Sequence, residues 1–235
     1  MCATFFLVRC EKVREAVRVV GTNAGTGKRS GGMRLVVLGA SGRLGRAVVE
    51  LALHDGHSVT AFVRDGLALG LPRQGLSVVV GDVLDPATLE GLFVEVDAVI
   101  SALGSPGNGP SVVRSLGCRN VVDAMERQGA RVLAAASVAA VEPGVNPMAL
   151  TSAMAHRQVL KDVRGMEEVI AESTLDWVIV RAPKLTDGPA TGNYRFAKRR
   201  PPLGGVVISR ADMAEAMLSC VHGPGRTHGT VAVAY

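Results

Sequence analysis

Residues 34–50 read RLVVLGASGRLGRAVVE, where a short apolar run leads into a turn with three glycines and then into a helical pattern. The run from Leu35 to Leu38 has no polar residue, as in a parallel strand that is buried on both faces. From Arg43 onward the apolar residues recur at helical spacing. The stretch is therefore predicted to form a strand, a tight turn and a helix, in that order.

The three glycines have separate tasks in this interpretation. Gly39 permits the tight turn, Gly42 lets the backbone approach a pyrophosphate, and Gly45 lets the helix pack closely on the strand. The free N–H groups of the first helical turn face the bound anion. A glycine triplet alone is a weak signal, but here a strand precedes it and a helix follows it. The stretch therefore predicts a dinucleotide-binding site.

The end of the next predicted strand, residues 58–63, indicates which dinucleotide binds. An Asp or Glu at this point commonly hydrogen-bonds the ribose 2′-hydroxyl of NAD, but this strand ends at Arg64. A guanidinium group can grip a 2′-phosphate with two hydrogen bonds, which favours NADPH. Arg43, inside the glycine turn, could place a second cation beside the same phosphate. In the alternative interpretation, Arg64 is a solvated loop residue and Asp65 contacts the ribose.

Composition is typical of one α/β domain. Residues 33–235 are enough for one large core, and apolar runs alternate with amphipathic helices, which predicts a doubly wound, mostly parallel sheet with helices on both faces. The net charge of +5 is spread out and only eight residues are aromatic, so nucleic-acid binding has little support. The four cysteines are far apart and show no metal-ligand spacing with the histidines, so no metal site is expected. They are expected to be reduced thiols in a cytoplasmic protein.

Residues 1–32 differ in character from the rest. The apolar FFLV segment is too short for a signal peptide, and no stretch is long enough to span a membrane. The segment GTNAGTGKRS at 21–30 departs from the phosphate-loop pattern in the spacing of its first glycine and at Arg29. We interpret residues 1–32 as a flexible leader. Met33 is a plausible true start, because it directly precedes the first strand.

The remaining chain repeats the alternation of strands and helices. Strands are predicted at 76–80, 96–103, 132–137, 175–180 and 206–208, and helices at 86–93, 111–128, 157–172 and 210–221. Asp82, just after the third strand, could bind an adenine amino group while Val83 packs on the ring. The glycine-rich turn at 104–109 is expected beside the ribose and nicotinamide. Ser137 ends the fifth strand, on the same ligand side of the sheet.

Several separated blocks together resemble the atypical short-chain dehydrogenase/reductases, and within them the biliverdin-IXβ and flavin reductase branch with its NAD(P)H-binding relatives. They are GASGRLG at 39–45, VRD at 63–65, VGDVL at 80–84, DAVI at 97–100, MEE at 166–168, LDWVIVRAP at 175–183 and LTDGPATG at 185–192. The resemblance runs from about Met33 to the C-terminus. It implies a single Rossmann-fold domain, NADPH as cofactor, and reduction of flavins, quinones or related planar acceptors. It implies cofactor contacts at Gly39, Ala40, Ser41, Gly42, Arg43, Leu44, Gly45, Arg64, Asp82, Val83, Leu103, Gly104 and Pro183.

Catalytic residues are less clearly marked. Typical members use a Tyr and a Lys four residues later on the helix after the fifth strand, where the Lys lowers the pKa of the phenol. That helix has no Tyr here, and the one Tyr-x-x-x-Lys match, Tyr194 to Lys198, lies in a segment at about 184–205 that is expected to be a substrate-side loop. Ser137 aligns with the active-site Ser of the family. The pocket His of the flavin reductase branch is replaced by Glu167, and His156 either reaches the pocket or lies on a helix surface.

The Glu in place of His bears on the substrate. A carboxylate repels an anionic tetrapyrrole, which argues against biliverdin, whereas flavins and quinones need mainly stacking on the nicotinamide and protons from water. Ser137 and Glu167 are the predicted catalytic residues of an NADPH-dependent reductase that acts on a planar small molecule as a monomer or weak homodimer. The alternative is a non-catalytic NADP(H) sensor, which the missing Tyr/Lys pair allows. A nucleotide-sugar epimerase or dehydratase is a third, weaker interpretation.

Overall fold

The computed structural model describes residues 32–66, 73–104, 111–142, 157–222 and 228–235. Residues 1–31 of the proposed leader, most of the glycine-rich turn at 104–109, and His156 lie outside these residues. The first predicted unit is present as a strand β1 (Arg34–Leu38) and a helix α2 (Arg43–His54) joined by the glycine turn. This unit starts an alternation of strands and helices that runs to the C-terminus.

The main sheet has eight strands in the order β3-β2-β1-β4-β5-β6-β10-β8. Every pairing is parallel except that of β8 with β10. The strands after β1 are β2 (Ser58–Val63), β3 (Leu76–Val80), β4 (Ala98–Ser101), β5 (Val132–Val138), β6 (Asp176–Ala182), β8 (Arg195–Lys198) and β10 (Gly229–Ala234). A separate parallel pair is formed by β7 (Lys184–Thr186) and β9 (Val207–Ser209).

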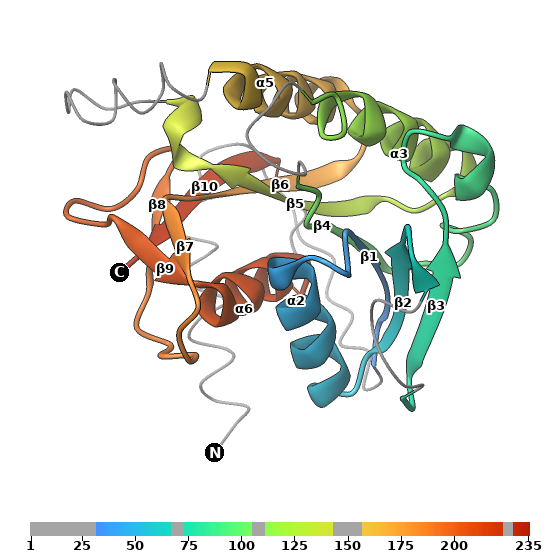
Figure 1. The fold of residues 1–235 in the computed structure, drawn as a ribbon, viewed down its shortest axis with the longest axis horizontal. Coiled ribbons are helices and arrows are strands. Elements are labelled where there is room, and N and C mark those ends of the chain that lie inside the picture. Colours follow the sequence, from blue (N-terminus) through green and yellow to red (C-terminus); the bar gives the residue numbers. More distant parts are fainter. Residues whose placement is uncertain (1–31, 67–72, 105–110, 143–156, 223–227) are drawn as a thin grey trace, which may run out of the picture.

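Helices cover both faces of the sheet, as expected of a doubly wound fold. One face carries α3 (Ser115–Gln128) and α5 (Arg157–Glu172), and the other carries α2 and α6 (Arg210–Val221) (Figure 1). Two short 3₁₀ helices, η2 (Pro86–Leu89) and η3 (Ala139–Val141), complete the elements. The predicted fold class is correct.

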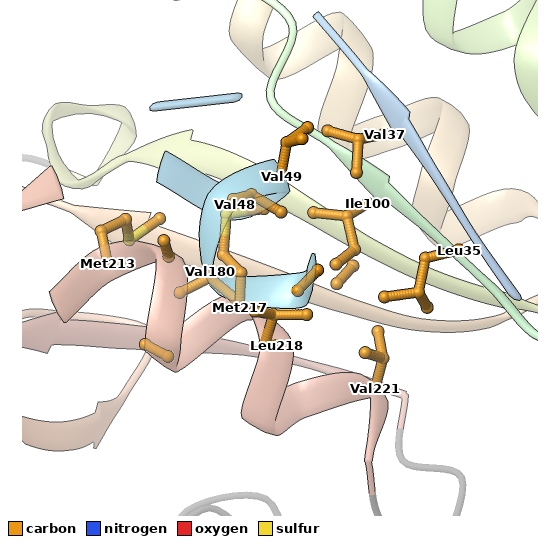
Figure 2. Packing of buried hydrophobic residues seen from close by; sticks show 14 of the residues in the cluster. Leu35, Val37, Val48, Val49, Ile100, Val180, Met213, Met217, Leu218 and Val221 are labelled. Carbon is orange, nitrogen blue, oxygen red and sulfur yellow. The ribbon is translucent and has the colours of Figure 1, made fainter. Parts of the chain in front are cut away.

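Each face has its own apolar core. In β1, Leu35 and Val37 point toward α2 and α6, while Val36 and Leu38 point toward α3 and α5. The core under α2 and α6 is drawn in Figure 2, where side chains of β1 and of both helices gather around Ile100 of β4. Strands buried on both faces explain why the sequence shows continuous apolar runs instead of alternation.

Three elements differ from the prediction. The helix expected at 86–93 is only the 3₁₀ turn η2, because Gly91 takes a left-handed φ of 74° soon after it. The segment expected as a substrate-side loop contains β7 and β8, and β8 forms the edge of the main sheet. The C-terminal strand β10 was not predicted. Its pairing with β6 is parallel and depends on the crossover through α6, a long-range contact that no local pattern announces.

Candidate functional site

The glycine turn has the geometry expected of a phosphate cradle. Gly39 has a φ of 72°, and a Cβ there would lie 2.7 Å from the carbonyl oxygen of Ala102. A Cβ at Gly45 would lie 2.2 Å from the carbonyl oxygen of Gly39, so only glycine lets α2 sit this close to the turn. The N–H of Gly42 closes the turn by donating to that same oxygen at 3.0 Å.

The start of α2 is left open for an anion. Gly42 is the N-cap, and it offers no side chain to the first N–H groups of the helix. Those groups are the ones that bind phosphate in dinucleotide-binding folds, and the helix dipole favours negative charge there. The cradle and the uncapped helix together fit the pyrophosphate of a dinucleotide. Ala40, Ser41 and Leu44 belong to the same turn and first helical positions.

Arg43, which follows the glycine turn, forms an ion pair with Asp187. Its Nη1 lies 3.1 Å from Oδ2 of Asp187, and the other oxygen of Asp187 binds Nη1 of Arg210. The side chains of Arg43 and Asp187 are 73% and 66% exposed, whereas that of Arg210 is 14% exposed. Arg210 is the first residue of α6, so one carboxylate joins the N-terminal ends of α2 and α6.

The residues predicted for the adenosine end lie at the carboxyl ends of β2 and β3. Arg64 is exposed directly after β2. Asp82 follows β3, and its Oδ1 accepts the N–H of Leu84 at 3.0 Å. Val83 is only 5% exposed and packs against Gly117 of α3, where a Cβ would come within 2.6 Å of its Cγ2. The Val83 side chain is thus a core residue, which leaves mainly its backbone for a ring to contact.

Leu103, Gly104 and Pro183 border the middle of the same edge. Leu103 and Gly104 follow β4, with Leu103 packed against the core under α3 and α5 and Gly104 exposed. An added Cβ at Gly104 would meet nothing closer than Nη2 of Arg114, at 4.0 Å, so its backbone is open to a ligand. Pro183 joins β6 to β7.

Ser137 and Glu167, the predicted catalytic pair, are in direct contact. Ser137 donates to Oε1 of Glu167 over 2.6 Å. Arg181 binds both carboxylate oxygens, with Nε 2.9 Å from Oε1 and Nη2 2.6 Å from Oε2. The side chains of Arg181 and Glu167 are 5% and 11% exposed, so they form a buried, bidentate ion pair. Arg181 belongs to the segment LDWVIVRAP at 175–183, and no role was predicted for it from the sequence.

The ion pair extends toward β8. Nη1 of Arg181 also binds Oε2 of Glu142 at 2.8 Å, and Arg199 holds the other oxygen of Glu142. Burial opposes the charged form of Glu142, but its bonds to Arg199 and the charge of Arg181 lower its pKa. Burial would lower the pKa of Arg181 as well, yet the bonds and charges of Glu167 and Glu142 raise it. Both shifts favour the charged forms of Glu142 and Arg181.

A hollow of about 600 Å³ adjoins this cluster. It is bounded by α5, by β6, by the end of β8 and by the start of β10, and Trp177 forms part of its wall beside His228. Glu167, Arg181 and Arg199 also line it. The hollow therefore lies next to the predicted catalytic residues, on the face of the sheet that carries α5.

The single Tyr-x-x-x-Lys match does not form a catalytic pair. Residues 195–198 are a strand, so the Cα atoms of Tyr194 and Lys198 are about 13 Å apart rather than one helical turn apart. Tyr194 is 8% exposed and packs in the core under α2 and α6, whereas Lys198 ends β8 at the border of the hollow.

A buried carboxylate anchors the segment after β7. Asp212 of α6 accepts from the backbone N–H groups of Thr191 and Gly192, from Oγ1 of Thr191, and from the hydroxyl of Tyr235. It is fully buried, which disfavours its charge, but the bonds from Tyr235, Gly192 and Thr191 lower its pKa. Nothing in the sequence distinguished Asp212 from a surface Asp at a helix start.

Residues 39–224 match the model of a family described as NAD(P)H-binding. The chain belongs to this NAD(P)H-binding family. The expected cofactor class is thereby confirmed. Solved structures described as short-chain dehydrogenases/reductases share the fold. One of these, from Veillonella parvula in complex with NADP, has a TM-score of 0.73 at 18% identity and covers 86% of this chain and 94% of that chain.

Other proteins similar to this chain have different described functions. ChuY, described as an anaerobillin reductase from Escherichia coli O157:H7, has a TM-score of 0.72 at 24% identity, covering 86% of this chain and 96% of its own. The photosystem II assembly factor Ycf39 of Synechocystis sp. is 27% identical over 161 residues, which are 66% of this chain. The chain spans 46% of the length of that relative. Family membership thus fixes the cofactor class and leaves the reaction open.

Two further findings concern the described part of the chain. None of its helices combines the length and the apolar character that a membrane crossing requires. Among these same residues, no three His, Cys, Asp or Glu side chains are grouped as a metal site would need.

Proposed function

We propose that this protein is an NADPH-dependent oxidoreductase that transfers hydride to a planar acceptor such as a flavin or a quinone. The observation that carries the proposal is the set of hydrogen bonds that Glu167 accepts. Its carboxylate accepts the hydroxyl hydrogen of Ser137 and two bonds from Arg181, so both of its oxygens are already engaged. Neither predicted catalytic side chain therefore offers a proton to the acceptor.

This arrangement distinguishes between classes of acceptor. Reduction of a simple carbonyl requires a positioned acid, whereas a flavin or quinone can be protonated from water once it is stacked on the nicotinamide. When bound, NADPH would supply the hydride. The hydroxyl of Ser137 has its hydrogen directed at Glu167, so its lone pairs remain to accept a bond from the nicotinamide amide or from the acceptor.

We place the acceptor at the end of the hollow that lies nearest Arg181, because the dinucleotide crosses the carboxyl ends of the strands. The lining has nearly balanced charge, with carboxylates on Glu142, Glu167 and Glu168 and cations on Arg164, Arg181, Lys198 and Arg199. A balanced lining favours acceptors of little charge. We therefore expect riboflavin and small quinones to be accepted at least as well as FMN.

For the cofactor we propose the same binding residues that the sequence predicts. We propose that the glycine turn holds the pyrophosphate, that Arg64 and Arg43 bind the 2′-phosphate, and that Asp82 receives the adenine amino group. Val83 would contribute its backbone. The proposal includes a cytoplasmic location and a monomer or weak homodimer.

A non-catalytic NADP(H) sensor is the second candidate. The observation that favours it is the same ion pair, since a site without a positioned acid suits a protein that binds NADPH and does not turn it over. Such a sensor would also be consistent with kinship to an assembly factor.

Steady-state oxidation of NADPH distinguishes the two candidates. The purified protein is assayed with riboflavin, FMN and a small quinone in separate reactions, with NADH in parallel, by loss of the absorbance of the reduced nicotinamide. Turnover that prefers NADPH and decreases in Ser137→Ala supports the reductase. Tight NADPH binding that differs from NADP⁺ binding, with no turnover of any acceptor, supports the sensor.

A further inference from the structure

Asp187 binds two arginines that lie at the N-terminal ends of helices. Its carboxylate is shared by Arg43, which opens α2, and Arg210, which opens α6. Two guanidinium groups and two helix N-terminal ends therefore face one carboxylate. The two guanidinium groups carry one positive charge more than the single carboxylate balances, and the two helix N-termini favour a further anion as well.

The two arginines that bind Asp187 differ in solvent exposure. Arg43 is 73% exposed and presents Nη1 to Asp187, and this is the end of the guanidinium that would grip a phosphate. A solvent-exposed pair of this kind contributes little free energy and is easily exchanged. Arg210 is 14% exposed and is held beside the core of α6, so its bond keeps Asp187 in place when the other one breaks.

The chain on either side limits how far Asp187 can move. β7, which ends at Thr186, is paired with β9, and Thr191 and Gly192 are fixed by Asp212. Asp187 thus stays within reach of Arg43 and competes with any other anion for it.

We propose that Asp187 is a specificity-determining residue that competes with the 2′-phosphate of NADPH for Arg43. Binding of NADPH exchanges the Asp187 carboxylate for the phosphate on Arg43, while Asp187 keeps Arg210. NADH has no 2′-phosphate and leaves the pair intact. This inference rests on the proposed placement of Arg43 and Arg64 around the 2′-phosphate. It means that this loop lowers the affinity for NADPH below what the two arginines alone would provide.

Asp187→Asn tests the competition. Asparagine keeps a carbonyl oxygen for Arg210 and removes the charge, so the fold is retained. Because an exposed ion pair contributes at most about 1 kcal/mol, the Kd for NADPH is expected to fall by about two- to five-fold, with the Kd for NADH unchanged. Kd is measured by quenching of Trp177 fluorescence or by calorimetry, without an acceptor.

Two further variants make the result specific. Glu90→Gln breaks an exposed ion pair with Arg127 of the same 3.1 Å length, at the far end of α3, and it should leave both Kd values unchanged. In an Arg43→Ala background, Asp187→Asn should no longer change the Kd for NADPH. An unchanged or weaker affinity for NADPH in Asp187→Asn would overturn the competition, as would an equal gain for NADH. Failure of the unaltered protein to bind NADPH would instead overturn the cofactor assignment and this inference with it.

Discussion

Ser137 and Arg181 lie directly opposite each other on β5 and β6, and both donate to the same oxygen, Oε1 of Glu167. Parallel pairing brings the ends of two strands together, and α5 lays a carboxylate across them. The three side chains thus come from three elements whose positions are set by the sheet. This explains how Glu167 becomes part of a charged cluster that holds Ser137 in one orientation.

Removing Arg181 is expected to cost more than removing the whole pair. In Arg181→Met the buried carboxylate of Glu167 loses two of its three bonds, and a loss of about 3–5 kcal/mol in the free energy of unfolding is expected. Urea denaturation measures it. In the double variant Glu167→Gln/Arg181→Met no charge is left without its partner at Glu167, so the loss should be smaller. A double variant as unstable as the single one would show that the ion pair does not account for the effect.

Arg64→Ala should change cofactor preference. If Arg64 binds the 2′-phosphate, its loss weakens NADPH binding by about 1–3 kcal/mol and leaves NADH nearly unaffected. The two Kd values are compared by titration of the purified variant. Equal losses for both cofactors would contradict the placement of the 2′-phosphate, and no loss for either would favour Asp65 as the ribose contact.

Gly45→Ala should destabilise the protein, although alanine is normally the better helix former. The added Cβ would meet the carbonyl oxygen of Gly39 at 2.2 Å, and backbone atoms on both sides cannot yield easily. A cost of about 1–3 kcal/mol is expected from overpacking. Gly188→Ala is the control, because its Cβ would meet only ordinary contact, at 3.6 Å. Thermal unfolding of both variants that gave equal midpoints would argue against the close approach of turn and helix.

His57 and His222 form a pair at the amino ends of the strands, far from the cofactor edge. Their Nε2 atoms are 2.8 Å apart, Nδ1 of His57 accepts the N–H of Met33, and Nδ1 of His222 lies 2.6 Å from the carbonyl of Leu218. Nδ1 of His57 is an acceptor in this arrangement, and a further proton would turn it into a donor. Burial, and next the charge of His222, lower the pKa of His57, while Asp55 opposes the shift.

Stability should therefore fall on mild acidification. The unfolded chain takes up a proton on His57 near the usual value of about 6.5, while the folded protein takes it up only at a lower pH. The stabilisation is complete above that value and is lost as the pH falls toward the lowered pKa. Urea denaturation at about one pH unit above and below 6.5 measures the loss. The loss should shrink in His57→Gln, and an equal loss in that variant would exclude the pair as its cause.

Much of the fold could be predicted because its signals are local. The apolar run at 35–38, the glycine turn and the helical spacing after Arg43 each depend on neighbouring residues, and the structure bears them out. The edge of the sheet could not be predicted this way. β8 pairs with β10 across more than thirty residues, and its sequence RFAK has neither the length nor the alternation that marks a strand.

The candidate site divides in the same way. The glycine turn could be predicted, because the spacing of its glycines in the sequence indicates the backbone conformation that they allow. The ion pair of Glu167 could not, because Arg181 meets Glu167 and Glu142 only after β5, β6 and α5 are assembled. A cation directly after the apolar run WVIV of β6 is the one signal that could have marked Arg181 as paired.

The most direct test of the account is an anaerobic single turnover with equimolar protein, NADPH and riboflavin. Spectra recorded over time follow the nicotinamide and the flavin together, so even slow hydride transfer is detected. If the protein is the proposed reductase, the reduced nicotinamide is lost in step with the bleaching of the flavin, faster than in a mixture without protein and faster than with NADH. Bound NADPH that stays reduced beside an unbleached flavin, and likewise beside a small quinone, would contradict it.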